Sequence, residues 1–500
     1  MRLYLHGHDC RYAAEQTLLM LYPGERPEYP EGGPEGDRVE LRVRASGGQL
    51  ICSALLVRGR LGYIGRASVP QSQLGSDSDR VKYTNRIVKL AFYRAALSSG
   101  LPKPEWGSLS GVRPVKLMDG YLRSGMDAAE AAVRFREEFL VSPARTGLTL
   151  SAALATKRVE AGLSERDVCL YVGIPFCPTR CSYCSFVSQS VEKSMKLMEP
   201  FLDALMQDIE ATAAEVRRLG LRPAALYMGG GTPTTLSAGQ LERLCSELGA
   251  QFDLSGLREF TVEAGRPDTI SMDKLETLRR HGVGRISVNP QTMSDAVLEA
   301  IGRRHTAQDI LDALGLVRGC GGFSVNMDLI AGLPTDTREG FSRTLDEVLA
   351  LGPENITVHT LSIKRGARLK LEEGGLPDGG CVGLMLDEAM EKLGGAGYAP
   401  YYLYRQKNMS GGFENVGWTL AGEESLYNIC IMEELCSIIA MGAGGSTKLV
   451  DRGGGRIKRM TAPKYPKEYI EAAAGFRAAK ERIGEFYGVQ PDGDKLPNGG

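Results

Sequence analysis

Residues 171–184 read YVGIPFCPTRCSYC, and this short stretch decides how the rest of the chain is interpreted. Its three cysteines, Cys177, Cys181 and Cys184, have the spacing CxxxCxxC and follow directly on the apolar run 168–174. Two prolines in the stretch prevent the run from continuing into a helix, because proline lacks a backbone N–H and clashes with the preceding turn. We therefore expect a buried strand that ends in a loop, with three thiols gathered in that loop.

Five further apolar runs follow this one, and amphipathic stretches separate them. Such an alternation, without long polar gaps, is typical of a parallel sheet covered by helices. Six strands with right-handed crossovers suit a partly closed barrel or an open doubly wound sheet, and in both the ligands bind at the carboxyl ends of the strands. The predicted strands are residues 168–174, 224–228, 259–263, 285–288, 324–330 and 355–359. The predicted helices lie near residues 193–219, 238–248, 271–281, 294–301, 307–319 and 339–351.

The segments on either side of this alternation have a different pattern. We expect an N-terminal α+β domain over residues 1–160, the α/β barrel over 161–365, and a C-terminal module with a polar tail over 366–500. The N-terminal segment shows no catalytic constellation, so we interpret it as a substrate-shaping or interaction domain. Its predicted strands are residues 2–5, 38–43 and 49–57, and its predicted helices are 13–21, 81–98, 127–139 and 148–161.

The composition excludes several classes of function. Sixty Lys and Arg residues against 61 Asp and Glu give a net charge of −1, so no overall field would attract nucleic acid or an acidic membrane. The N-terminus has no signal-peptide core, and no stretch reaches the roughly 18 apolar residues of a membrane span. Eleven cysteines, an odd number and mostly scattered, are typical of free thiols or ligands in a reducing compartment. We expect a cytoplasmic protein without a nucleic-acid partner or a membrane span.

The three thiols of the loop are compatible with two kinds of metal site. Three thiolates without a fourth leave one iron of a cubane cluster open to a small molecule, whereas a four-thiolate cluster is closed. A structural zinc site uses four ligands, commonly in paired CxxC elements, and the loop has no second pair. The pattern favours the iron–sulfur interpretation over zinc.

Polar or glycine-rich motifs follow the later predicted strands in order. Glycines without side chains let an amino-acid-like ligand approach the backbone closely, and a carboxylate can accept hydrogen bonds from both hydroxyls of a ribose. The motif residues are Gly229, Gly230, Gly231 and Thr232 after the second strand, Glu263 at the end of the third, Gln291 after the fourth, Arg303 beyond the next helix, and Asp328 on the fifth.

Together with the cysteine loop, these motifs resemble the radical S-adenosylmethionine (SAM) superfamily. The resemblance implies a partial (β/α)6 barrel, a [4Fe–4S] cluster held by Cys177, Cys181 and Cys184, and SAM as the second cofactor. It also implies that SAM is held by the motif residues just named. Tyr171, on the first strand, would position the cluster and SAM, and Tyr183 would present its backbone to adenine.

Within the superfamily, the order of motifs resembles the oxygen-independent coproporphyrinogen III oxidase (coproporphyrinogen dehydrogenase) family, in its HemZ type. The resemblance implies oxidative decarboxylation of coproporphyrinogen III to protoporphyrinogen IX in anaerobic haem biosynthesis. A 5′-deoxyadenosyl radical would remove a hydrogen from a propionate, and loss of carbon dioxide and of a second electron would leave a vinyl group. It implies a porphyrinogen substrate and an unidentified electron donor and acceptor. Candidate cations for the substrate carboxylates are Arg303, Arg304, Lys364 and Arg365.

Two departures from the family pattern leave alternatives open. Phe186 stands where the oxidases proper have a further cysteine, and Gly173 stands where the oxidases and related haem chaperones usually have a histidine. Phe186 is similar to the chaperone branch (HemW-like), which binds haem without decarboxylation. However, the His-Asn and Tyr-Trp pairs of that branch are missing from residues 424–429. The alternatives are therefore a haem chaperone and a radical SAM enzyme with another substrate.

Overall fold

The structure is a computed structural model, and it describes residues 1–111, 113–184, 189–362, 378–406, 412–453 and 455–488. The chain forms two compact units, Met1–Leu150 and Ser151–Gly500. Among the described residues, no helix is both long enough and apolar enough to cross a membrane. Helix α5 (Pro143–Ala161) contains the division between the units.

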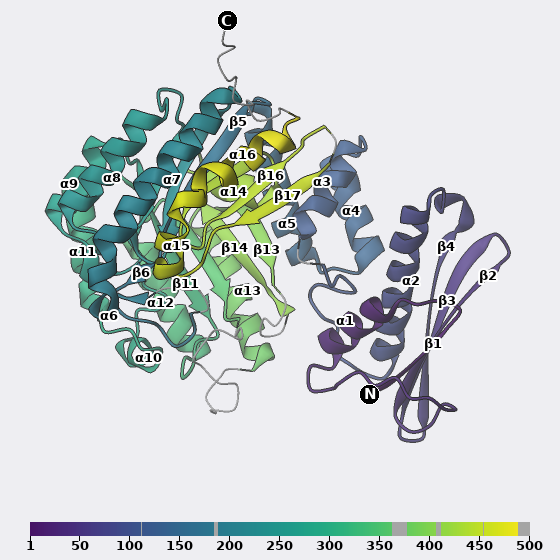
Figure 1. Cartoon of the computed structure of the whole chain (residues 1–500). Helices are drawn as coiled ribbons and strands as arrows, with labels where there is room; N and C mark the ends of the chain where they lie inside the picture. The colour runs from purple at the N-terminus through teal and green to yellow at the C-terminus, as the bar shows by residue number, and fades with distance from the viewer. Residues whose placement is uncertain (112, 185–188, 363–377, 407–411, 454, 489–500) are drawn as a thin grey trace, which may run out of the picture. The chain divides into compact units, whose positions relative to one another are not determined.

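The first unit contains a four-stranded sheet in the order β1-β2-β3-β4 (Figure 1). Strands β1 and β2 pair in parallel, and the remaining neighbours pair antiparallel. Helix α2 covers the sheet so closely that a Cβ on Gly65 of β4 would lie 2.1 Å from the carbonyl oxygen of Ala91 on α2. The strands are β1 (Arg2–His6), β2 (Arg38–Ser46), β3 (Gln49–Arg58) and β4 (Leu61–Pro70). The helices are α1 (Arg11–Leu21), α2 (Asp77–Ser98), α3 (Pro114–Arg123) and α4 (Ala128–Phe139).

The second unit contains an eleven-stranded sheet, in the order β13-β14-β12-β11-β10-β9-β8-β5-β15-β16-β17. Its central strands, from β12 to β5, run parallel, as the sequence predicts. The α/β fold class with a partial barrel is therefore confirmed. These strands are β5 (Asp167–Ile174), β8 (Arg222–Gly230), β9 (Glu259–Glu263), β10 (Arg285–Ser287), β11 (Ser324–Ala331) and β12 (Asn355–Thr360).

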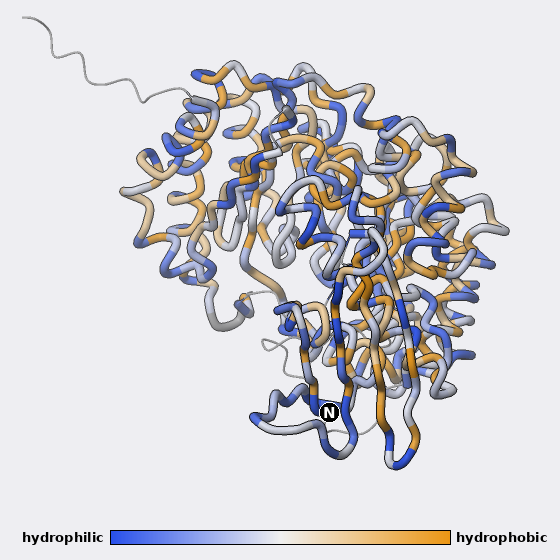
Figure 2. Tube along the Cα trace, turned by 90° about the vertical axis from the view of Figure 1, so that its right-hand side faces the viewer, coloured by the Kyte–Doolittle hydropathy of each residue, from blue (hydrophilic) through white to orange (hydrophobic). Residues whose placement is uncertain are grey.

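Helices connect and cover these strands (Figure 1). Along the chain, apolar residues recur within the helices and fill the strands, and Figure 2 shows this as orange segments of the trace. The helices are α6 (Val191–Ser194), α7 (Met198–Arg218), α8 (Ala238–Gln251), α9 (Met272–Arg280), α10 (Asp295–Ala300), α11 (Ala307–Cys320) and α12 (Arg338–Leu351). Two short strands, β6 (Phe176–Cys177) and β7 (Gln189–Ser190), pair with each other beside the cysteine loop.

The C-terminal residues extend the same sheet at both of its edges. Strand β14 (Glu414–Thr419) pairs antiparallel with β12, and β13 (Ala399–Arg405) pairs with β14. At the other edge, β15 (Ser437–Gly442) runs parallel to β5. The predicted limits at residues 160 and 365 remain proposals, but the segment expected as a C-terminal module shares one sheet with the barrel. The other elements are β16 (Ser446–Val450), β17 (Ile457–Thr461), α13 (Gly379–Gly395), α14 (Leu426–Glu433), α15 (Pro466–Glu471) and α16 (Phe476–Phe486).

A buried carboxylate on α7 ties the C-terminal elements to the barrel. Both Asp208 and Lys480 are at least nine-tenths buried, and the Lys480 ammonium lies 2.7 Å from the Asp208 carboxylate. The same carboxylate accepts hydrogen bonds from the Tyr469 hydroxyl, at 2.6 Å, and from the Gly442 N–H, at 3.0 Å. One side chain thus joins α7 to α15, α16 and β15.

We predict that Asp208→Asn destabilises the protein by about 3–5 kcal/mol, because removing one charge of a buried pair leaves the other without compensation. Chemical denaturation followed by circular dichroism measures this loss. The exposed Asp203→Asn, five residues earlier on the same helix, is the matched control and should change stability by less than about 0.5 kcal/mol. Equal stability of the two variants would contradict the assignment of Asp208 as the tie.

Candidate active site

The candidate site lies at the carboxyl ends of the parallel strands. The sheet register places Gly173 of β5 beside Gly229 of β8, and it places Glu263 of β9 beside Ser287 of β10. Asp328 lies on β11, which is the neighbour of β10 in the sheet. The fold therefore brings most of the predicted motifs to the carboxyl-end side of the parallel strands, where α/β proteins bind their ligands.

The glycine motif holds the start of the cysteine loop through its backbone. The N–H of Gly231 donates to the carbonyl of Ile174 at 2.7 Å, and the N–H of Thr232 donates to the carbonyl of Phe176 at 2.7 Å. The Thr232 hydroxyl lies 3.6 Å from the Cys177 sulfur. A Cβ on Gly231 would lie 2.4 Å from the Phe176 carbonyl oxygen, so glycine is required for this close approach.

Two buried arginines flank the middle cysteine of the loop. Cys181 is buried, and Arg266 lies with Nη1 4.0 Å from its sulfur while donating to the Thr179 hydroxyl at 2.9 Å. Arg303 donates to the Tyr183 hydroxyl at 3.2 Å. Burial opposes the Arg303 charge, yet its pKa is raised because Tyr183 and Cys181 favour the cation. These guanidinium groups supply positive charge beside thiolates, which stabilises a negatively charged metal–thiolate centre.

Glu263 lies inside the barrel against the glycine motif. A Cβ on Gly229 would meet the Glu263 carboxylate at 2.9 Å, and the Tyr227 hydroxyl donates to that carboxylate at 2.7 Å. Burial raises the pKa of Glu263 to about 7, and the charge of Asp328 adds to this effect, whereas the bonds from Tyr227 and the Gly230 N–H oppose it. The carboxylate is therefore poised to gain from a cationic ligand.

Three tyrosine rings pack together beside this carboxylate. The rings of Tyr227 and Tyr427 stack with centroids 4.3 Å apart, and the Tyr171 ring lies 6.3 Å from Tyr227 and 6.2 Å from Tyr427. Burial, followed by the Glu263 charge, raises the pKa of Tyr171. Its hydroxyl lies 3.3 Å from the position that a Cβ on Gly230 would take. Tyr171 therefore reaches the glycine motif, as a positioning residue would.

Gln291, in the segment that follows β10, meets Asp328 of β11 through the backbone. The N–H of Gln291 donates to the Asp328 carbonyl at 2.9 Å, and Gln291 has a φ of +69°. Burial works against the Asp328 charge, but the neighbouring His359, Asn326 and Thr357 together lower its pKa. The Asn326 amide donates to the carboxylate at 2.8 Å. Asp328 is thus held as an anion that can accept hydrogen bonds.

Two predicted residues, Arg303 and Tyr183, meet at the cysteine loop. The Arg303 guanidinium donates to the Asn289 carbonyl at 2.6 Å as well as to the Tyr183 hydroxyl, so it joins the cysteine loop to the segment that follows β10. The Tyr183 side chain packs on the apolar cluster that contains Ile301 and Leu333. The roles of both in SAM binding stay predictions. Arg304 is exposed, and Phe186, Lys364 and Arg365 lie outside the described residues.

Sequence reasoning missed Arg266 and His305 beside the cysteine loop. The only signal for Arg266 is its position three residues after Glu263. Both ring nitrogens of His305 are buried without a hydrogen-bond partner among the described residues. Burial, together with the charges of Arg303 and Arg266, lowers the His305 pKa to about 3. A neutral imidazole and two cations therefore surround this side of the loop.

We predict that Arg266→Gln slows reductive SAM cleavage roughly 10–100-fold, which is the usual cost of losing a group that supports a metal centre from outside its ligand set. The physical reason is the loss of positive charge 4.0 Å from the Cys181 sulfur, which makes adding an electron to the cluster less favourable. A redox titration followed by electron paramagnetic resonance (EPR) should show a lower midpoint potential. Arg279→Gln, a surface arginine that bonds the Cys320 carbonyl, is the control; an unchanged potential in the Arg266 variant would contradict the prediction.

A second group of thiols lies in the core of the same unit. Cys169 on β5, Cys430 on α14 and Cys436 before β15 are buried, and their sulfurs all lie within 4.8 Å of one another. The Cys169 and Cys436 sulfurs are 3.6 Å apart. Among the described residues, only this group has three such ligand atoms close enough to share one ion. The cysteines of the 177–184 loop are more widely spread, as ligands to separate irons of one cluster would be.

A partial α/β barrel whose first strand ends in a three-cysteine loop defines the radical SAM class, and the model of the radical SAM superfamily matches residues 171–348. The chain is 38% identical over 377 residues to the oxygen-independent coproporphyrinogen-III oxidase-like protein HemZ of Bacillus subtilis, covering 73% of this chain and 74% of that protein. It therefore belongs to the oxygen-independent coproporphyrinogen III oxidase family, in its HemZ type.

Two other relatives show the breadth of this family. The heme chaperone HemW of Haemophilus influenzae is 29% identical over 307 residues, which are 60% of this chain and 75% of that protein. The solved structure of coproporphyrinogen III oxidase (HemN) from Escherichia coli aligns with a TM-score of 0.51 and 26% identity, over 64% of this chain and 72% of that one. Family membership alone thus leaves catalyst and chaperone open.

Proteins of this superfamily use a [4Fe–4S] cluster and SAM, and the residues present fit both groups. The loop offers three thiols, and Arg266 beside Cys181 offers charge compensation. The glycine motif offers a cradle that any Cβ would fill, as the 2.9 Å clash at Gly229 with Glu263 shows. The cluster and the amino-acid end of SAM would therefore be held by adjoining parts of one site.

Proposed function

We propose that the protein is an oxygen-independent coproporphyrinogen III dehydrogenase, which converts two propionate side chains of coproporphyrinogen III to vinyl groups. The observation that carries the proposal is the convergence of the cysteine loop, the glycine motif and the Glu263 carboxylate in one site. The resemblance to the HemZ protein over most of the chain supports the same substrate class.

When bound, the cluster and SAM supply a one-electron reduction and a carbon-centred radical that removes a hydrogen atom. Each propionate would lose one hydrogen atom, one carbon dioxide and one electron in total, and a vinyl group would remain. An external electron donor and acceptor are therefore required.

In this scheme the protein's own residues bind the cluster, orient SAM and exclude water. Cys177, Cys181 and Cys184 hold the cluster through their thiolates. The glycine motif and Glu263 bind the methionine amino group and balance the sulfonium charge, and Asp328 accepts hydrogen bonds from the ribose. The rings of Tyr171, Tyr227 and Tyr427 pack against one another next to Glu263, and this aromatic packing limits the access of water to the reacting atoms.

A haem chaperone is the second candidate, because HemW proteins are relatives. The histidines of the second unit are unfavourable for an open haem ligand: His281 bonds Glu242 at 2.8 Å, His359 lies 3.9 Å from Asp328, and His305 is buried. This favours the dehydrogenase.

Anaerobic turnover tests the proposal. The reconstituted protein is incubated with coproporphyrinogen III, SAM and a reductant, and the products are separated by liquid chromatography with mass detection. We expect vinyl-bearing products and 5′-deoxyadenosine in a ratio near one per propionate. Stable haem binding without a vinyl product would support the chaperone instead, and deoxyadenosine without porphyrin turnover would indicate another substrate.

A further inference from the structure

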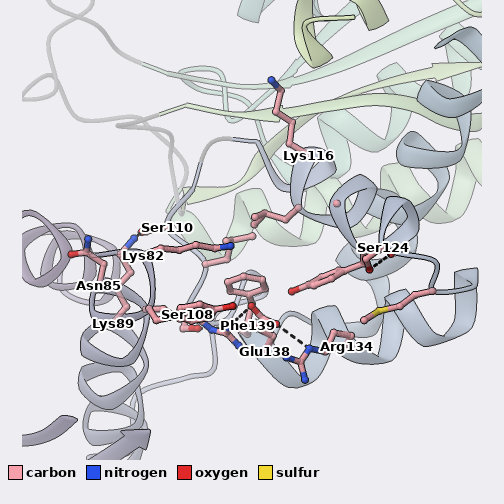
Figure 3. A pocket seen from close by; sticks show the side chains of 17 residues that line it. Lys82, Asn85, Lys89, Ser108, Ser110, Lys116, Ser124, Arg134, Glu138 and Phe139 are labelled. Carbon is pink, nitrogen blue, oxygen red and sulfur yellow. Dashed lines mark hydrogen bonds and ion pairs between the residues drawn. The ribbon is translucent and has the colours of Figure 1, made fainter. Parts of the chain in front are cut away.

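A cavity lies within the first unit, and none of the residues of the proposed active site lines it. It has a volume of about 560 Å3, which falls in the range of about 300–1,000 Å3 found for small-molecule sites. Figure 3 shows the side chains that line it, which come from α2, from the segment 108–110, and from α3, α4 and the turn between them. None of these residues enters the proposed function.

The cavity has a strong excess of positive charge. Its lining includes five cationic side chains and one carboxylate, Glu138. Arg134 lies 3.1 Å from that carboxylate, and Arg86 forms a second ion pair with it. The carboxylate is therefore already neutralised by arginines. The cationic residues are Lys82, Arg86, Lys89, Lys116 and Arg134.

Lys89 is the lining residue that most clearly indicates an anionic ligand. Its ammonium donates to the Ser110 hydroxyl at 2.7 Å, and no carboxylate of the described residues forms an ion pair with it. Burial lowers the pKa of Lys89, so the protein environment itself does not favour the charge. A bound oxyanion would supply the missing counter-charge.

The uncharged lining combines apolar and aromatic side chains with Asn85 and three serines. The Arg86 guanidinium lies 5.4 Å from the centroid of the Phe139 ring, so a cation and an aromatic face adjoin in the same wall. A ligand here would place an apolar body on these faces and its anionic groups on the lysines and arginines. The apolar lining residues are Tyr83, Leu109, Leu117, Tyr121, Met126 and Phe139.

We propose that this cavity binds a small amphipathic anion, a molecule that joins an apolar body to two or more oxyanion groups. This goes beyond the proposed function, because it assigns a ligand site to the unit without the barrel. The carboxylates of a porphyrin and the phosphates of a nucleotide share this chemistry, and the experiment distinguishes them.

The two tryptophans of the chain, Trp106 and Trp418, allow binding in the two units to be separated. Trp106 is buried two residues before Ser108 of the cavity lining. In the full-length Trp418→Phe protein, quenching of Trp106 fluorescence is titrated with coproporphyrin III, its uncharged tetramethyl ester, and ADP. The test variants are Lys89→Gln and Lys89→Gln/Arg134→Gln, and the control is Lys103→Gln, an exposed lysine outside the lining.

We expect saturable quenching by coproporphyrin III, none by the ester, and a dissociation constant at least tenfold higher in the double variant but unchanged in the control. If the double variant binds ADP at least tenfold more weakly but its porphyrin binding is unchanged, the cavity is still an anion site, and its ligand carries phosphates. The proposal would be overturned if neither Lys89 variant changed the dissociation constant for either anion. Thermal midpoints show whether the variants are folded. Turnover of coproporphyrinogen III by the full-length protein is measured in parallel. Absence of turnover, with porphyrin binding to the cavity intact, would count against the proposed dehydrogenase activity and not against the cavity site.

Discussion

Replacing Cys181 by Ala is expected to remove the iron–sulfur absorbance of the reconstituted protein and to reduce SAM cleavage to the background of the assay. The loop has three thiols and no fourth, so losing one leaves two ligands for a cluster that needs three. Cys181 is also the thiol flanked by Arg266 at 4.0 Å. Iron and sulfide analysis with absorbance spectroscopy and quantified 5′-deoxyadenosine checks both effects.

A matched control separates ligand loss from general damage. Cys245 is a buried cysteine on α8, and burial raises its pKa to about 12, so it is an inert core thiol. Cys245→Ala should keep full cluster content at a cost of about 1 kcal/mol in stability, for the small cavity it creates. A brown, active Cys181→Ala protein would show that the cluster is held elsewhere, and the Cys169, Cys430 and Cys436 group would then be the next candidate.

Glu263→Gln is expected to weaken SAM binding roughly 10–100-fold, because a hydrogen bond to a charged group contributes about 1.5–3 kcal/mol. The pKa of Glu263 is raised to about 7, so SAM affinity of the unaltered protein should increase as pH rises through 7. The variant has no such titration, and its affinity should stay flat over that range. Equilibrium dialysis of SAM between pH 6 and pH 8 measures both effects.

The same substitution should stabilise the protein in the absence of SAM. A carboxyl whose folded-state pKa lies above its unfolded value binds more protons when folded, so its contribution to stability is lost as pH rises from about 4.5 to 7. At pH 8 the charged and desolvated Glu263 is therefore unfavourable, and Glu263→Gln should have a higher thermal midpoint. Glu299→Gln, an exposed carboxylate on α10, is the control. A lower midpoint together with unchanged SAM affinity would show that Glu263 is a structural group.

Much of the barrel can be predicted from the sequence because its strands and helices alternate with clear apolar periods. The sequence at the predicted strand ends also predicts the site. The features that do so are the cysteine spacing, three consecutive glycines and single carboxylates such as Glu263 and Asp328. These features are local, and a local pattern needs no knowledge of what packs against it. The strands that the sequence predicts lie within a few residues of those observed.

The parts that could not be predicted depend on distant contacts. Strands β14 and β15 are buried along their whole length, so they lack the alternation that marks a half-exposed strand. Arg266 acquires its position beside Cys181 only when β9 and β5 share a sheet. Cys169, Cys430 and Cys436 are separated by up to 267 residues, and no spacing rule could bring them together.

The most direct test concerns the iron that the three thiolates leave without a protein ligand. The reduced protein is examined by EPR and electron–nuclear double resonance, with and without SAM labelled with 15N at its amino group and 17O at its carboxylate. Binding at an open iron predicts a changed EPR spectrum with hyperfine coupling to both labels, and loss of both in the Cys181→Ala protein. An iron–sulfur spectrum that SAM leaves unchanged, with no coupling to either label, would contradict the account.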